Sequence, residues 1–433
     1  MMPQSSFMVM APIDPRREVD LRSLLASMND GPGRTNANNS LVPFSRFDTL
    51  HVARFVIIDD KTVGDVAAYG LKPVAYPLYL AFVGDVDGDG DAFLRAAARE
   101  VPNGLRAIFS CCEGFTSDTD LLHWMKAHSV SSAATYVNWR GRTVRRNRED
   151  AALFESLQKF IQTSETDVCA MPAQQAHVAL RTHALSEVAA GRLTLSPEPP
   201  TPLGWRIRDF VHLVGVPVLA LAASPVLLPA ALLMLLRLRL AEKTDAELCA
   251  RVDDAYSNAL ADLEDHDVTN QFTAMGSIKP GLVRRWSVSS AFFAIDYAAR
   301  HIFTRGGLAR VRTIHFARWV FLDGKKRAVF MSNYDGSLES YMDDFINKVG
   351  FGLNIAFSGG IGYPTTKWLV GDGCSDERKF KEYLRRHQVP SQVWYKAYPG
   401  QTAIDLERNG RIRDGLEQQM LTEQGAREWV ALL

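Results

Sequence analysis

Two histidines in closely similar segments are the residues of this chain best suited to chemistry. His51 lies in residues 49–59, TLHVARFVIID, and His315 lies in residues 313–323, TIHFARWVFLD. Both segments alternate and are rich in β-branched and aromatic residues, which predicts strands. A neutral imidazole on a strand can bind a metal or haem iron, or act as an acid–base group. The alternative interpretation is a hydrogen-bonded core histidine in each segment.

The two segments belong to an internal duplication. Three blocks recur in the same order: 49–59 with 313–323, 80–115 with 328–363, and 128–141 with 387–400. Arg54 and Arg318 occupy matching positions, three residues after each histidine. In both halves the second block contains an Asp-Gly pair, which is Asp335-Gly336 in the second half. Three blocks in one order are not expected by chance, so we infer two homologous modules.

Each half has the predicted element order β-β-α-β-(α)-β-α. The segments at 77–84 and 326–333 are expected to be second strands, and the runs at 107–112 and 355–360 buried third strands. Strict alternation places His315, Ala317 and Trp319 on one face of their strand. We therefore expect an α+β fold in which two four-stranded antiparallel sheets, with helices on one face, pack as an intramolecular pseudodimer around a cavity.

This arrangement resembles the dimeric α+β barrel superfamily of ferredoxin-like repeats, over about 115 residues in each half. That group includes dye-decolorising peroxidases and chlorite dismutases, and the resemblance implies a haem in the inter-repeat cavity. Gly84-x-x-Asp87-Gly88 is similar to the GxxDG motif of the peroxidases, whose Asp lies on the distal side of the haem. The order predicted for this chain departs from the family's β-α-β-β-α-β and would be a permuted form of it.

If iron is bound, His315 is the expected axial ligand, because a strand holds its imidazole rigidly. Arg318 and Asp335 are then expected catalytic groups: the Arg stabilises charge on a peroxide oxygen and the Asp accepts a proton. His51, its mate in the first half, is a third candidate, and Arg54 is expected to bind the cofactor. His301 is a competing ligand candidate.

A long apolar segment separates the two modules. Residues 210–236 carry no charge, and Trp205, Arg206 and Arg208 precede them while Arg237 and Arg239 follow. Such a run is typical of membrane contact; the alternative is a buried core helix. Three prolines argue against one straight helix. Because a single crossing would separate the two modules, and because both flanks are basic, we expect a re-entrant or monotopic hairpin anchored on the cytoplasmic face.

The whole chain is divided as follows: an N-terminal extension (1–44), the first repeat (45–165), a linker (166–204), the membrane-anchoring hairpin (205–240), a helical connector (241–307), the second repeat (308–420) and a C-terminal tail (421–433). The 49 basic and 49 acidic side chains leave no net charge, which argues against a nucleic-acid partner. The sequence therefore predicts a membrane-associated, peroxidase-like oxidoreductase acting on an apolar or lipid substrate. The alternative is a non-enzymatic, monotopic lipid-binding or scaffold protein. Oligomeric state is left open.

Overall fold

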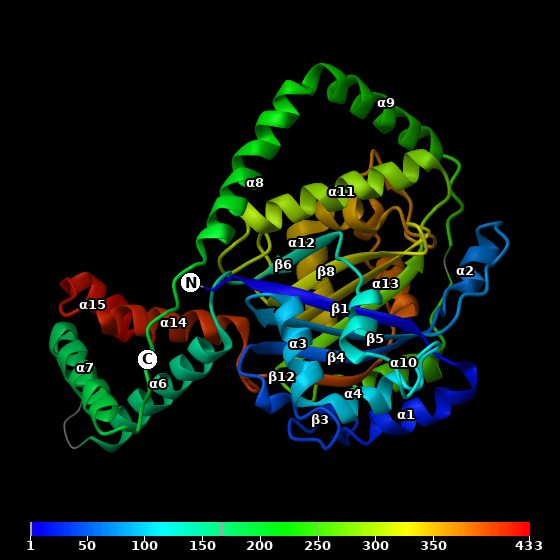
Figure 1. Cartoon of the computed structure of the whole chain (residues 1–433). Helices are drawn as coiled ribbons and strands as arrows, with labels where there is room; N and C mark the ends of the chain where they lie inside the picture. Colours follow the sequence, from blue (N-terminus) through cyan, green and yellow to red (C-terminus); the bar gives the residue numbers. More distant parts are fainter. Residues whose placement is uncertain (1, 165–167, 249) are drawn as a thin grey trace.

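Two four-stranded antiparallel sheets form the centre of the protein (Figure 1). The computed structural model describes residues 2–164, 168–248 and 250–433. The first sheet has the order β1 (Gln4–Pro12), β5 (Tyr79–Asp87), β4 (Leu50–Ile58), β12 (Ser391–Lys396); the second has the order β6 (Ala134–Val137), β8 (Ile314–Leu322), β9 (Arg327–Asp335), β7 (Thr269–Ser277). Two short hairpins, β2 (Asn29–Gly31) with β3 (Arg34–Thr35) and β10 (Thr366–Lys367) with β11 (Gly371–Asp372), lie outside them. The predicted α+β class is confirmed.

Each sheet contains one strand from the other half of the chain. β12 pairs with β4, so that Trp394 lies opposite Arg54, and β6 pairs with β8, so that Tyr136 lies opposite Ala317. The residues just before these two strands bond instead to an outer strand of the other sheet. Val130, before β6, donates its N–H to Met8 O of β1, and Val389, before β12, donates its N–H to Thr273 O of β7. These bonds, with the isolated bridges Val9–Ser129 and Ala274–Gln388, join the two sheets at both sides, so that together they form a barrel.

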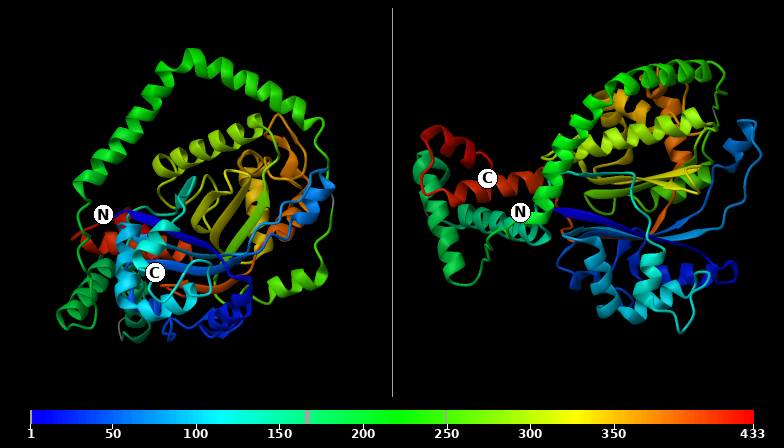
Figure 2. Two further views of the ribbon diagram at one scale, coloured as in Figure 1. Left: turned by 45° about the vertical axis from the view of Figure 1, so that its right-hand side comes forward. Right: turned by 45° about the horizontal axis from the view of Figure 1, so that its top comes forward.

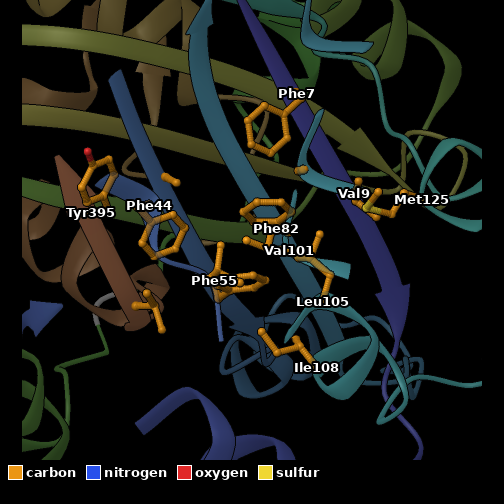
Figure 3. Packing of buried hydrophobic residues seen from close by; sticks show 14 of the residues in the cluster. Phe7, Val9, Phe44, Phe55, Phe82, Val101, Leu105, Ile108, Met125 and Tyr395 are labelled. Atoms are coloured by element: carbon orange, nitrogen blue, oxygen red, sulfur yellow. The ribbon is translucent and has the colours of Figure 1, made fainter. Parts of the chain in front are cut away.

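Helices cover the outer face of each sheet. The first sheet packs against α1 (Glu18–Ala26), α3 (Gly90–Glu100), α4 (Pro102–Phe109) and α5 (Leu121–Ala127); the second packs against α11 (Leu282–His301), α12 (Leu338–Phe357) and α13 (Glu377–His387). Figure 3 shows part of the first core, where Phe55 and Phe82 stack at 4.5 Å. A third, smaller core lies between the sheets and contains Val56, Val83, Val320 and Val329. Both faces of each sheet are thus buried.

Four helices form a bundle beside the sheets: α6 (Val144–Thr163), α7 (Ala173–Ala189), α14 (Ala403–Glu417) and α15 (Glu423–Val430). The bundle stands to one side in Figure 1 and in the right-hand view of Figure 2. Because α6 follows β6 and α14 follows β12, it joins the ends of both halves. The remaining short helices are α2 (Val63–Ala68) and α10 (Asp254–Ala261).

The apolar segment forms an arch of two helices, α8 (Leu203–Ala222) and α9 (Ser224–Glu242), which meet at a bend at Ala223. Figures 1 and 2 show the arch standing away from the sheets, above α11. In the described residues, α9 is the one helix long and apolar enough to cross a membrane. Nearly all of its side chains are exposed, so the buried core helix considered above is wrong.

The structure corrects three expectations about the elements. The runs at 107–112 and 355–360, predicted as strands, instead end α4 and α12, because periodicity does not separate a short buried strand from a buried helix. The strands that complete the sheets are β1, within the expected N-terminal extension, and β7, within the expected helical connector. In each half a strand and a helix thus precede the elements that were predicted, and the predicted order β-β-α-β-(α)-β-α is wrong.

Candidate functional site

A β-bulge positions each of the two histidines. Leu50 of β4 lies opposite Val86 and Val52 lies opposite Asp85, so His51 is an additional residue in its strand. A bulge interrupts the alternation of a strand and re-aims the inserted side chain. His51 therefore lies against groups between the sheets, and only 1% of its surface is exposed.

The same register shift occurs at His315, between Ile314 and Phe316. The prediction that His315 shares a face with Ala317 and Trp319 is therefore wrong: these two side chains pack in the core beneath the helices. His315 lies instead on the inner side, where it and His51 line one cavity.

This cavity lies at the end of the barrel beside the bundle and has a volume of about 30 Å³. A cavity of this size holds about one water molecule. Besides the two histidines, it is lined by Gln4, Val137, Asn138, Trp139, Arg142, Asn147, Phe316, Tyr398 and Leu406.

His51 is held at both ring nitrogens. Its Nε2 lies 3.0 Å from Asp87 Oδ1 and its Nδ1 lies 3.1 Å from Tyr398 Oη. The other oxygen of Asp87 accepts a hydrogen bond from Val144 N, in the first turn of α6. Asp87 therefore links the imidazole to the N-terminus of a helix, where a negative charge is favourable.

His315 has an equivalent carboxylate partner. Its Nε2 lies 2.7 Å from Asp335 Oδ1, and Asp335 Oδ2 accepts from Ala403 N in the first turn of α14. Thr269 Oγ1 donates to the same carboxylate at 2.6 Å, and Lys396 Nζ donates to Thr269. The two halves thus place two imidazole–carboxylate pairs on either side of the cavity.

The pKa values of Asp335 and Lys396 both lie below their usual values, for different reasons. Burial opposes the charge of Asp335, but the contacts with His315, Thr269 and Ala403 N outweigh it, so its pKa lies below the usual value. Burial lowers the pKa of Lys396 to about 8, although Asp267 and Asp335 oppose the shift. Asp335 is therefore an ionised acceptor at neutral pH, which suits it to hold His315 and the helix in place.

Arg54 and Arg318 lie between the sheets but do not line the cavity. Arg318 donates to Phe7 O at 3.0 Å and to Gly84 O at 3.2 Å, both in the first sheet. Arg54 donates to Phe272 O and Ser332 O, each at 3.0 Å, in the second sheet. Each guanidinium thus crosses from its own sheet to backbone carbonyls of the other, and the pair cross-links the two layers.

The two arginines differ in their charge partners. Arg318 forms an ion pair of 2.5 Å with Asp85, whereas Asn333 stands at the position of the second block that matches Asp85. The Asn333 Oδ1 atom is buried without a hydrogen-bond partner. Burial, with the neighbouring Arg318, lowers the pKa of Arg54 to about 9. The two halves therefore share one buried carboxylate between two guanidinium groups.

These residues do not fit a haem. Both ring nitrogens of His51 are hydrogen-bonded, and His315 Nε2 is held by Asp335. The cavity that the two imidazoles share is about 30 Å³, which has no room for a macrocycle. Within the described ranges, no three His, Cys, Asp or Glu side chains are grouped so as to hold a metal ion. The residues expected to bind haem form structural hydrogen bonds instead.

A second group of polar residues lies near the start of α8, at one foot of the arch; a foot is an end of the arch that contacts the rest of the protein. Asp209 forms an ion pair with Arg300 of α11 at 2.9 Å, and His212 Nδ1 lies 2.8 Å from His301 Nε2. Tyr297 donates to the Leu213 carbonyl at 2.9 Å. His301, the competing ligand candidate, therefore ties the arch to α11.

The foot of α9 is fastened to the same body by Glu242. Its carboxylate accepts from Thr366 Oγ1 at 2.8 Å, Trp368 N at 2.9 Å and Leu369 N at 2.7 Å. Only 5% of Glu242 is exposed. Both ends of the arch are therefore bonded to the second sheet's layer of helices and loops.

No protein-family model, curated protein or solved structure matches this chain.

Sequence reasoning missed the two feet of the arch. Asp209, His212 and Glu242 are single polar residues at the ends of an apolar run, and their partners Arg300, His301 and Leu369 lie 89 to 127 residues further along the sequence. The one available signal was the presence of a carboxylate, Asp209, directly before 27 uncharged residues.

Proposed function

We propose that this chain is a monotopic membrane protein that binds lipid through the α8–α9 arch and holds its two-sheet body on one side of the bilayer. The observation that carries the proposal is that both feet of the arch bond to one body, through Asp209 and Glu242. A helix pair with both ends on one body can enter a bilayer and return, but it cannot place the two halves on opposite sides.

The surface of the arch supports insertion. Large apolar side chains point outward along both helices; the most exposed are Leu219 (70%), Leu221 (76%), Val226 (72%) and Leu228 (69%). A helix that is apolar on all sides is typical of a buried or membrane environment, and this one is not buried in the protein. Burying one such Leu or Val side chain contributes about 1.5–3 kcal/mol.

The residues at the feet suit the polar edge of a bilayer. Trp205 lies at the start of α8 under Arg140, and Trp368 lies beside the end of α9 under Arg239. Tryptophan and arginine are favoured at the level of lipid head groups. Basic residues at both feet favour the cytoplasmic face, which is part of the proposal.

The arrangement of the sheets supports the proposed two-repeat origin. Equivalent strands occupy equivalent places in both sheets, and the exchanged strands β6 and β12 close the barrel in the same manner on both sides. This pattern agrees with a resemblance to the dimeric α+β barrel superfamily. The contents of the barrel favour the lipid-binding or scaffold alternative over a haem peroxidase, because arginines, valines and hydrogen-bonded histidines fill it.

Two measurements test the proposal. Purified protein bound to sealed vesicles is treated with an external protease, and we expect both halves to be digested while a short peptide containing residues 210–236 remains protected. Protection of either whole half would mean a single crossing and would overturn the monotopic assignment. An absorption spectrum of the purified protein is expected to lack a Soret band, and a stoichiometric Soret band would overturn the haem-free barrel.

A further inference from the structure

A strongly basic pocket lies at the other end of the barrel from the histidine cavity. It has a volume of about 320 Å³ and is bordered by the loop after α2, the β8–β9 turn and the start of α11. Five basic residues are among those that line it, with one acidic residue, Asp60; the basic residues are Lys72, Lys279, Arg285, Lys325 and Lys326.

Two of these charged groups are already engaged outside the pocket. Lys279 forms an ion pair of 2.8 Å with Asp245. Asp60 accepts from Thr62 and lies 3.3 Å from Arg327 Nη1. The pocket's carboxylate is therefore occupied by a cation that is not part of its lining.

The other four cations have no carboxylate partner in the described part of the chain. Lys325 Nζ donates to Ser289 Oγ at 2.9 Å, a neutral acceptor. Lys72, Arg285 and Lys326 form no side-chain ion pair among the described residues. Four like charges around one concave pocket repel each other, and an anion bound between them would relieve that repulsion.

The backbone contributes donors at the same place. The 20-residue helix α11 begins at Leu282, directly after Pro280 and Gly281 in the pocket wall, and no side chain caps its first turn. Uncapped N–H groups at a helix N-terminus, together with the helix dipole, favour an anion. The cationic side chains and the helix terminus thus converge on one volume.

The pocket also lies next to apolar side chains that suit a lipid. Leu282 and Trp286, one helical turn apart on α11, are 68% and 65% exposed, and Arg285 lies between them in sequence. The helix α11 also packs against α9 of the arch. A phosphate group in the pocket would therefore have an apolar surface beside it that continues towards the proposed membrane segment.

We propose that this pocket binds the phosphate group of an anionic glycerophospholipid. The lipid source rests on the proposed membrane attachment, whereas the phosphate chemistry does not. Lys326 and Arg285 supply charge from two sides, and the exposed Leu282 and Trp286 contact the glycerol and first methylenes of the same lipid. The arch supplies insertion into any bilayer, and the pocket supplies preference for an anionic one.

The test compares vesicles of phosphatidylcholine with vesicles that also contain phosphatidic acid, using flotation of the full chain at fixed ionic strength. We expect the wild type to prefer the anionic vesicles, and Arg285→Gln/Lys326→Gln to bind them about 30-fold more weakly, because each cation near an anionic surface contributes roughly a fivefold gain in binding. Binding of the variant to neutral vesicles is expected to be unchanged. The matched control, Arg99→Gln/Lys126→Gln, removes two exposed positive charges from α3 and α5, the helices that cover the first sheet.

Four outcomes are distinguishable. Equal losses in the pocket variant and in the control would overturn the pocket. Wild type that binds neither kind of vesicle would overturn the membrane proposal alone. Phosphate binding by the pocket is then tested with glycerol 3-phosphate, whose ³¹P resonance should shift on addition of the wild type and not on addition of the variant. Absence of that shift would overturn phosphate binding. A shift without any preference for anionic vesicles would overturn the lipid source. Circular dichroism confirms that both double variants are folded.

Discussion

Replacing Arg318 with Met is expected to destabilise the fold by about 3–5 kcal/mol, because it removes one partner of a buried ion pair. Asp85 is 5% exposed and lies 2.5 Å from Arg318, so the substitution leaves a carboxylate between the sheets without its direct counter-ion. It also removes the donors to Phe7 O and Gly84 O. Arg54 remains nearby and keeps the loss from being larger.

The loss should depend on pH in a defined direction. Burial already holds the pKa of Asp85 above its usual value, although Arg318 and Arg54 oppose the shift. A carboxyl whose pKa is higher in the folded state binds its proton more readily there, so stability falls as pH rises through the folded pKa. Without Arg318 that pKa rises further. The deficit of Arg318→Met should therefore be largest near pH 8 and smaller near pH 5.

Urea unfolding followed by tryptophan fluorescence, at pH 8 and pH 5, measures both effects. Asp85→Asn is the informative comparison, because the second half already has an asparagine, Asn333, at the matching position; we expect a loss of about 1–2 kcal/mol, well below that of Arg318→Met. Arg22→Met, on an exposed i,i+4 pair with Glu18, should cost under about 0.5 kcal/mol. A deficit for Arg318→Met below 1 kcal/mol, or one equal at both pH values, would refute the reasoning.

Three further outcomes are expected. Asp335→Asn should lower the free energy of unfolding by about 2–3 kcal/mol at pH 7. Because the pKa of Asp335 is depressed in the folded state, the extra stability of the wild type is present above the unfolded pKa near 3.9 and is lost as pH falls below it. Urea unfolding of both proteins from pH 6 to pH 3 measures this difference. Leu228→Glu should reduce vesicle flotation more than 100-fold without lowering Tm, since the side chain is 69% exposed, whereas Val178→Glu on α7 should leave flotation unchanged. Gly360→Ala should lower the free energy of unfolding by about 1–3 kcal/mol, because its Cβ would lie 2.5 Å from Tyr383 Oη; a Tm equal to wild type would contradict this.

The sequence predicted most strands that carry the duplicated blocks. β4 and β8 lie within the expected segments, and β6 and β12 lie within the third block; β5 and β9 overlap the expected segments but end at Asp87 and Asp335, beyond their predicted ends. Their alternation and β-branched content are local properties, which a single sequence records. The pairing of β6 and β12 with the opposite half is a non-local choice, and nothing in either segment specifies its partner.

The histidine positions show where local patterns fail. A bulge is defined by the register against a neighbouring strand, so TLHVARFVIID gives no sign that His51 is inserted. β7 was missed for a related reason: it contains Thr269, Gln271 and Thr273, which resemble a polar turn. In the fold these side chains bond to Asp335, Ser391 and Arg54. Polar residues that satisfy one another inside a barrel cannot be told from solvated ones by composition.

The strand exchange has a consequence for synthesis of the chain. β12 emerges from the ribosome about 330 residues after β4, the strand beside which it must insert, so the first sheet keeps an open edge until almost the whole protein is made. The arch at 203–242 emerges long before that. On the proposed membrane attachment, capture of the arch by a bilayer precedes closure of the barrel, and the bilayer holds the unfinished first half in place while the second is made. A chain that ends before residue 391 leaves the edge of β4 exposed, and an uncovered hydrophobic edge strand is a site of aggregation.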